Sequence, residues 1–510
     1  MLYDVYINLP TRNLSDAYTY SSEDNLEVGT LVKVKFGAND KFGIIACTRS
    51  RSIIPPNKIK AISKVLSNGS IVHDRTITYA KLISRYYCTS LGEVLFSLLP
   101  SHTVLKKMSK PFGYTQHKSM GVEFVTASFA QRMTYYAQII RDNIEKGHQS
   151  IIIFPNYRRV DIAIRFFSEL LGSENVCELS DRLKAQETNR NINWMQSGKM
   201  KVAIGTRKTF FAPTSNLASI IIDQPTNYAY YNDQKPAYKI YRLALELNKQ
   251  FGTKIVFGDN TPDLESVLLA RRGRLRFIFP KKPIKIPLVW QETTTQKSIA
   301  LVGGKLRLIV APFLDSFGSD TYGNLSAQNI FTNINTSKVL ITSKENITTL
   351  PKHRPLTVVA TKKIIDCPEL YFDEILIVGA EAWLSLESHD ASYDFVSLVW
   401  RLWPQAREKL IIQSTGPVPV IEDILGAKPG KALGIFMSSR KNFNLPPYTL
   451  EIIFKTKEAE KLIEILPNES RATINNNDTV TAYIKPNLWP PDNIDDIYRL
   501  CQKVNIDKPK

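Results

Sequence analysis

The sequence predicts an α/β protein of several domains: a small β-rich domain, two lobes of alternating strands and helices, and a short α+β domain at the end. Three observations lead to this fold class. The chain of 510 residues is too long for one hydrophobic core, which predicts about two to four domains. Its first hundred residues combine basic and apolar strands with glycine turns. From residue 122 onward, short apolar strands alternate with helical periods, the pattern of a parallel, doubly wound sheet.

The opening hundred residues predict a small barrel. Residues 32–36 alternate apolar and basic side chains, the period of a half-buried strand with its cations toward solvent. Residues 37–41 predict a turn, because Gly, Asn and Asp accept the backbone angles of a tight reversal. Residues 42–46 return as an apolar strand. Glycines beside basic and aromatic residues suit a strand of nucleic acid whose bases stack on the rings, although solvated lysines on a barrel give the same pattern.

These residues resemble the amino-terminal domain of the primosomal protein N′ (PriA) family, the bacterial replication-restart helicases. The resemblance rests on Tyr18-Thr19-Tyr20, Val34-Lys35-Phe36-Gly37, Gly43-Ile44 and Ile59-Lys60-Ala61. It implies a module that grips the 3′ end of a nascent DNA strand, with a pocket formed by Tyr18, Thr19, Gly37 and Lys60. The family often has aspartate where Thr19 stands, and the threonine hydroxyl would hydrogen-bond the terminal hydroxyl of DNA. Lys33 and Lys35 complete the predicted DNA-binding set of this domain.

Composition and charge narrow the possible partners. The 66 basic residues outnumber the 48 acidic ones, and a net charge of +18 favours a polyanion, nucleic acid first. The five cysteines form no CxxC pair and the six histidines have no ligand spacing, so we expect neither disulfides nor a metal site. The apolar runs are strand-sized, and Asp4 and Asn8 interrupt any signal peptide. A reducing cytoplasm fits these features.

The predicted domains are a 3′ DNA-binding domain over residues 1–100, a basic linker over 101–121, a first lobe over 122–288, a second lobe over 289–436 and a truncated carboxyl-terminal domain over 437–510. The family carries a winged-helix domain near the linker, and this chain has too few residues for one. In the first lobe we expect helices over 130–146 and 160–171 and strands over 151–154, 202–205, 220–223 and 255–258. In the second we expect strands over 306–311, 339–342, 357–360 and 374–379. Residues 492–504 predict a final amphipathic helix.

The first lobe also resembles the first motor lobe of the PriA family. The matching segments are Gly205-Thr206-Arg207, Ile220-Ile221-Ile222-Asp223 and Gly258-Asp259-Asn260-Thr261-Pro262. The resemblance implies two RecA-like helicase lobes and places Arg207 on DNA. The densest basic run, residues 271–276 with Lys281, Lys282 and Lys285, either lines a DNA path or is a solvated connector.

The elements that would bind and hydrolyse ATP are degenerate. A phosphate cradle needs glycines that bring backbone N–H groups to the phosphates, a lysine, and a hydroxyl for Mg²⁺. Where the family has Thr-Gly-Ser-Gly-Lys-Thr, residues 126–133 are Thr-Ala-Ser-Phe-Ala-Gln-Arg-Met. Ser128 and Arg132 are remnants of that site, and Phe129 would fill the space of the phosphate.

The remaining catalytic elements are reduced in the same way. Asp223 could still hold Mg²⁺, but Gln224 replaces the carboxylate that orients the attacking water. Arg401 or Arg407 is a leftover arginine finger, and the zinc-binding cysteines of the family are missing. We therefore expect no bound ATP, Mg²⁺ or zinc and no useful ATPase activity.

Together these features predict a pseudo-helicase that binds forked or single-stranded DNA with a 3′ end, with replication-restart proteins as further partners. Two alternatives remain at this level. One is a divergent ATP-dependent 3′–5′ DNA helicase, and the other is a scaffold that recruits replication proteins.

Overall fold

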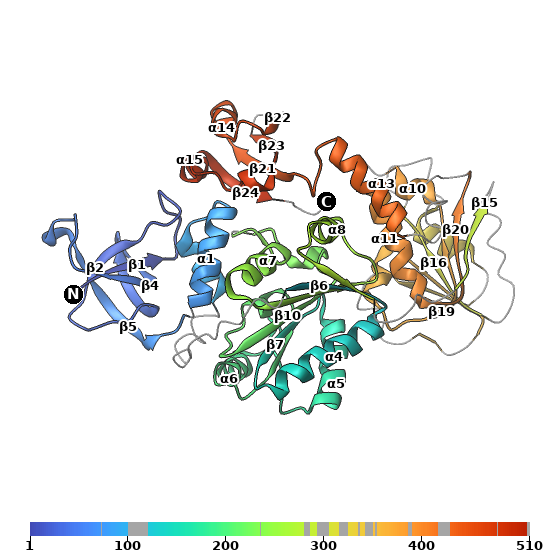
Figure 1. Cartoon of the computed structure of the whole chain (residues 1–510), viewed down its shortest axis with the longest axis horizontal. Coiled ribbons are helices and arrows are strands. Elements are labelled where there is room, and N and C mark those ends of the chain that lie inside the picture. The colour runs from blue at the N-terminus through green and yellow to red at the C-terminus, as the bar shows by residue number, and fades with distance from the viewer. Residues whose placement is uncertain are drawn as a thin grey trace.

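The computed structural model describes residues 1–72, 74–99, 121–234, 236–279, 286–292, 305–315, 325–334, 337–341, 350–351, 354–385, 390–416, 429–476 and 478–506. The predicted linker before Gly121 and the lysines at 281, 282 and 285 lie outside these residues. In Figure 1 the amino-terminal domain and the second lobe lie on opposite sides of the first lobe, and the carboxyl-terminal domain lies above it. None of the helices described is long and apolar enough to cross a membrane.

The amino-terminal domain is a closed barrel with the strand order β1-β2-β5-β3-β4. Its strands are β1 (Leu2–Ile7), β2 (Tyr18–Ser21), β3 (Thr30–Phe36), β4 (Asn39–Arg49) and β5 (Lys60–Ser70). Val32 and Val34 fill the barrel, and Lys33 and Lys35, which alternate with them, face outward as predicted. The turn is shorter than predicted, because Phe36 already pairs with Asn39. Two helices follow the barrel, α1 (Asp74–Tyr86) and α2 (Leu91–Leu98).

The first lobe is a seven-stranded parallel sheet with the order β14-β6-β13-β10-β7-β9-β8. Its strands are β6 (Val122–Thr126), β7 (Gln149–Ile153), β8 (Val176–Glu178), β9 (Val202–Gly205), β10 (Leu217–Asp223), β13 (Lys254–Asp259) and β14 (Arg276–Ile278). Its helices are α4 (Phe129–Glu145), α5 (Tyr157–Leu171), α6 (Ala185–Gln196), α7 (Ile240–Phe251) and α8 (Leu264–Arg271), with a ribbon of β11 (Tyr231–Asn232) and β12 (Tyr238–Lys239). Helices α4 and α5 cover one face of the sheet, while α6 and α7 share the core of the other face with α1 and α2.

The second lobe is a six-stranded parallel sheet with the order β15-β20-β19-β16-β18-β17. Its strands are β15 (Leu288–Glu292), β16 (Leu306–Val310), β17 (Lys338–Ile341), β18 (Leu356–Ala360), β19 (Phe372–Ile377) and β20 (Ala406–Ser414). Its helices are α9 (Ala327–Asn333), α10 (Ala380–Leu384), α11 (Ala391–Leu402) and α13 (Pro429–Asn442), with a short 3₁₀ helix, η7 (Lys362–Asp366). Two parallel sheets flanked by helices confirm the predicted pair of RecA-like lobes.

The carboxyl-terminal domain is a four-stranded antiparallel sheet with the order β22-β23-β21-β24. It contains β21 (Leu450–Thr456), β22 (Arg471–Asn476), β23 (Thr479–Ile484), β24 (Cys501–Ile506), α14 (Ala459–Ile465) and α15 (Ile494–Leu500). The predicted helix over 492–504 is wrong in its second half. Val504 and Ile506 alternate with polar residues, so they pack as a strand against β21. The Nε1 of Trp489 donates to the Tyr86 carbonyl (2.9 Å) and thereby joins this domain to the first.

Candidate functional site

The predicted 3′-end pocket gathers at one end of the barrel. The Tyr18 ring meets the Phe36 ring edge-on, with centroids 4.9 Å apart. The Nζ of Lys60 donates to the carbonyl oxygen of Gly37 (3.2 Å). Gly37 has φ +61°, a conformation that a side chain disfavours, and nothing lies within 4 Å of the place where a Cβ would stand. The structure thus brings an aromatic ring, an open backbone turn and a cation together.

Thr19 lies apart from these three residues. Its hydroxyl donates to Oδ1 of Asp4 (2.9 Å), and the Nε of Arg49 donates to Oδ2 of the same carboxylate (2.5 Å). Successive side chains of a strand point to opposite faces, so Thr19 points away from the face shared by Tyr18 and Tyr20. The sequence reasoning missed Asp4 and Arg49. Their charges sit on neighbouring antiparallel strands, and only the register of β1 with β4 brings them together.

The other predicted DNA-binding residues differ in their availability. Lys35 is exposed, whereas the Nζ of Lys33 lies 2.7 Å from Oδ2 of Asp40. Arg207 is committed to the fold, because its Nη1 donates to the carbonyl of Tyr231 (2.6 Å). The basic run begins with exposed side chains at Arg271, which ends α8, and at Arg272 and Arg274, which follow it.

A second group of charged residues lies where the parallel strands of the first lobe end, the edge at which such sheets bind ligands. Asp223 ends β10 and is paired with Gly258, and Asp259 ends β13 one residue further on, so both carboxylates lie at the same edge of the sheet. Helix α4 begins just after β6 on the same edge. Its first turn is closed by its own residues, since Ser128 and Gln131 form a reciprocal capping box.

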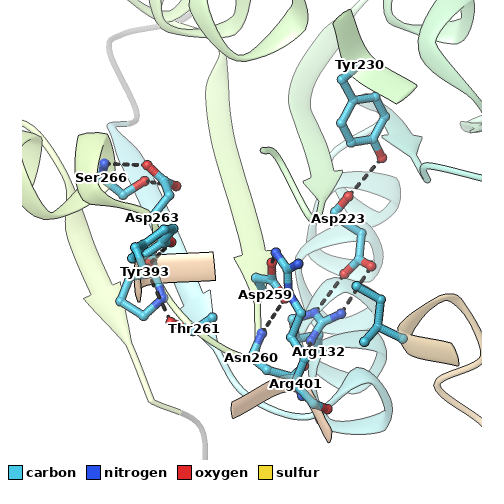
Figure 2. A network of polar contacts seen from close by, with 12 residues as sticks. Arg132, Asp223, Tyr230, Asp259, Asn260, Thr261, Asp263, Ser266, Tyr393 and Arg401 are labelled. Carbon is cyan, nitrogen blue, oxygen red and sulfur yellow. Dashed lines mark hydrogen bonds and ion pairs between the residues drawn. The ribbon is translucent and has the colours of Figure 1, made fainter. Parts of the chain in front are cut away.

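The Asp223 carboxylate is held by two arginines (Figure 2 shows the first of them). Arg132 donates from Nε to Oδ1 (2.7 Å) and from Nη2 to Oδ2 (3.1 Å), a bidentate pair. Arg159 donates from Nη1 to Oδ2 (2.9 Å). The side chains of Asp223, Arg132 and Arg159 are 0%, 1% and 2% exposed. We call these three residues the buried triad.

Aromatic residues surround the buried triad. The Phe129 ring lies 5.0 Å from the guanidinium carbon of Arg159 and 5.7 Å from that of Arg132, within cation–π range. The hydroxyl of Tyr136 donates to Oδ1 of Asp223 (3.0 Å). Burial and the facing carboxylate raise the pKa of Tyr136 well above its ordinary value, so its hydroxyl remains a donor. Burial opposes the charge of Arg132, but Asp223, with Tyr136 and Asp259, outweighs burial and raises the pKa of Arg132.

The two candidate finger residues have different partners. Arg401, at the end of α11, donates from Nη2 to Oδ2 of Asp259 (2.6 Å). Arg407 lies near the start of β20, where its Nη1 is 3.7 Å from Oδ1 of Asp373, and its side chain is 62% exposed. Of the two, Arg401 therefore reaches the first lobe.

Known proteins match this chain in sequence. A family model described as the 3′ DNA-binding domain (3′BD) of PriA matches residues 4–100. The replication restart protein PriA of Rickettsia prowazekii is 29% identical over 273 residues, which cover 49% of this chain and 41% of that protein. The PriA of Haemophilus influenzae is 21% identical over 379 residues, covering 54% of this chain and 51% of that protein. The chain is therefore similar to PriA proteins over its amino-terminal domain and over about half of its length.

The extent of these matches is limited. The chain spans about half the length or less of the curated PriA relatives it matches. Among solved structures, RecG bound to a three-way DNA junction aligns with a TM-score of 0.40 and 14% identity, covering 62% of this chain and 43% of that one.

The residues at the PriA nucleotide position do not fit ATP and Mg²⁺. A phosphate needs free N–H donors at the start of a helix, and the first turn of α4 carries its own capping box there. A magnesium ion needs free carboxylate oxygens, yet both oxygens of Asp223 accept from arginine. Arg132 also donates from Nη1 to the Ala127 carbonyl (2.7 Å). In the residues described, no group of three or more His, Cys, Asp or Glu side chains gathers to hold a metal.

Sequence reasoning named Arg132 and Asp223 as separate remnants, named Asn260 only within a matching segment, and missed Arg159 and Tyr136. One feature of the sequence could have pointed to Arg159, because it stands three residues after Asn156, a residue type that often caps the start of a helix. The Oδ1 of Asn156 accepts from the Arg159 backbone N–H (3.0 Å) and starts α5. That cap orients the first turn of α5 toward the edge where β10 ends.

Proposed function

We propose that this protein binds DNA with an exposed 3′ end, at forks or other branched structures, and that it does so in replication restart without hydrolysing ATP. The match of residues 4–100 to a 3′ DNA-binding domain supports the DNA partner. The observation that carries the proposal is the pocket of Tyr18, Gly37 and Lys60 within the matched residues. A terminal base can stack on the Tyr18 ring, while the open turn admits the sugar and Lys60 meets the last phosphate.

The absence of ATP hydrolysis is supported by the buried triad. Hydrolysis needs a metal ion and a positioned water beside the phosphate. Asp223 is saturated by arginine, and the neighbouring residue is Gln224 rather than an acid. DNA-stimulated release of phosphate from ATP by the purified protein would instead establish the divergent helicase.

The pocket is tested with two forks that differ in one group, a 3′ hydroxyl or a 3′ phosphate at the end of the leading strand. Binding is followed by fluorescence anisotropy at several salt concentrations. We expect the hydroxyl fork to bind several-fold more tightly, because an added phosphate crowds the end of the barrel. Equal affinity for both forks would refute the pocket.

Two lysines of β5 supply a matched comparison. Lys60→Ala removes the cation beside Gly37 and should erase the preference for the hydroxyl fork. Lys64 is exposed on the same strand, paired with Lys33 on the outer face. Lys64→Ala should weaken both forks equally and lower the salt dependence of binding, as expected for a contact to backbone phosphate.

A further inference from the structure

The two lobes meet through contacts that involve the residues of the nucleotide position themselves. Arg159 belongs to the buried triad, and its Nη2 donates to the carbonyl of Ile365 in the second lobe (2.9 Å). One guanidinium therefore holds Asp223 and the opposite lobe at once. Arg158, its neighbour, forms an ion pair with Glu369 of the second lobe.

Asn260 and Arg401 form a second bridge, seen in Figure 2 below Asp259. Arg401 pairs with Asp259, whose carboxylate is almost fully buried. Asn260 donates from Nδ2 to the Arg401 carbonyl (3.2 Å) and accepts from Nη1 of Arg132 at Oδ1 (2.6 Å). This amide therefore connects the buried triad to the helix end of the second lobe. Burial disfavours the charge of Arg401, yet Asp259 outweighs it and raises the pKa of Arg401.

Apolar packing flanks these polar bridges. Leu264 and Leu268 of α8, a helix of the first lobe, are buried in the core of the second. Nearby, the hydroxyl of Tyr393 on α11 donates to the carbonyl of Pro262 (3.1 Å). The contact between lobes thus combines ion pairs, hydrogen bonds and a shared core, and it runs along the edge where a motor holds its nucleotide.

We infer that these contacts, which we call the interlobe latch, replace nucleotide and hold the two lobes in a single arrangement whether ATP is present or not. A motor closes its lobes because a ligand supplies charge that residues of both lobes bind. Here the side chains of Asp223 and Asp259 supply the negative charge, and arginines from both lobes bind it. The lobes therefore form one rigid support for the amino-terminal and carboxyl-terminal domains, instead of a pair that opens and closes.

Hydrogen-exchange mass spectrometry of the full chain without DNA tests the latch. The informative peptides cover α8, whose Leu264 and Leu268 enter the core of the second lobe, and η7, whose Ile365 carbonyl accepts from Arg159. Strands β7 and β10 report on the interior of the first lobe. In the unmodified protein we expect the same slow exchange at α8 and η7 with and without an excess of Mg²⁺ and a non-hydrolysable ATP analogue. Protection that appears only with the analogue would overturn the inference.

Arg401→Ala removes the ion pair with Asp259, although the backbone carbonyl that accepts from Asn260 remains. It should raise exchange at α8 and η7 at least about tenfold, with β7 and β10 unchanged. Unchanged β strands show that the lobe stays folded, so the effect belongs to the latch. Tyr393→Phe deletes a single interlobe hydrogen bond and should produce a smaller rise at the same peptides. Arg407→Ala is the matched control, because this exposed arginine pairs with Asp373 of its own lobe.

If Arg401→Ala and Tyr393→Phe leave α8 and η7 as slow as in the unmodified protein, the latch is refuted. The result is independent of the proposed DNA pocket, since no DNA is present and every substitution lies in the lobes.

Discussion

Replacing Asp223 by alanine would leave two arginines buried without the carboxylate that both of them face. The side chains of Arg132 and Arg159 are almost fully buried, so water cannot replace the lost charge. Removing one partner from a buried ion pair typically costs about 3–5 kcal/mol, because an uncompensated charge remains. In a motor that holds Mg²⁺ through this aspartate, the same substitution would chiefly remove activity. Here we expect it to remove stability.

The magnitude can be set against a solvent-exposed pair in the same lobe. Asp181 lies 3.0 Å from Nζ of Lys208, and both side chains are more than half exposed. Exposed pairs contribute about 0–1 kcal/mol, so Asp181→Ala should change the stability of the lobe very little. Asp223→Asn keeps an acceptor oxygen but loses the charge. We expect its loss of stability to lie between that of Asp181→Ala and that of Asp223→Ala.

Hydrogen exchange at β7 and β10 measures the opening free energy of this lobe separately from the other domains. A loss of about 3–5 kcal/mol accelerates exchange by about two to four orders of magnitude. The reasoning fails if Asp223→Ala and Asp181→Ala exchange equally slowly at these strands. It also fails if Asp223→Asn matches the unmodified protein, since charge would then not be the quantity that matters.

Two further predictions concern the surroundings of the buried triad. Gly258→Ala would place a Cβ 1.8 Å from the Tyr136 hydroxyl, so we expect thermal unfolding to show a loss of about 1–3 kcal/mol in stability. Gly434→Ala, whose Cβ would have nothing within 4 Å, should cause no loss of stability. Burial raises the pKa of Asp263 from 3.8 to about 6, so the folded protein binds this proton more tightly than the unfolded chain. Between those two values the unfolded chain loses the proton first, and rising pH therefore lowers stability until the cost levels off above about pH 6. Asp263→Asn keeps the acceptor for the Ser266 N–H (2.7 Å) and should be more stable than the unmodified protein by up to about 3 kcal/mol at pH 8 in urea titrations, with no difference near pH 3.

The two lobes could be predicted from the sequence because buried parallel strands are continuous apolar runs that end at polar residues or glycine. Residues 202–205 form β9 as predicted, and residues 255–258 fall within β13. The end of the chain was harder. Residues 501–506 carry apolar side chains at positions that suit either period, and their pairing with β21 decides for a strand.

The site could be predicted residue by residue but not as an arrangement. Arg132 and Asp223 were recognisable because each stands at a position where the family has a catalytic residue. Their ion pair joins residues 91 apart in sequence, and nothing local specifies such a partner. The choice between Arg401 and Arg407 depended on where α11 ends and β20 begins, since Arg401 in the last turn of the helix reaches Asp259 of the first lobe, whereas Arg407 in the strand pairs with Asp373 of its own lobe.

Charge balance explains why the missing phosphate cradle and the new arginine contacts belong together. Arg132, Arg159 and Arg401 carry three positive charges, and Asp223 and Asp259 carry two negative ones. Guanidinium N–H groups of Arg132 and Arg159 that do not face a carboxylate donate to the carbonyl oxygens of Ala127 and Ile365. The excess positive charge is therefore already hydrogen-bonded by the protein. An incoming phosphate would have to break these bonds before it gained any of its own. The arginines that hold the two lobes together therefore also make this edge of the sheet a poor binding site for ATP. Substitution of Asp223 should weaken both the contact between the lobes and the exclusion of ATP.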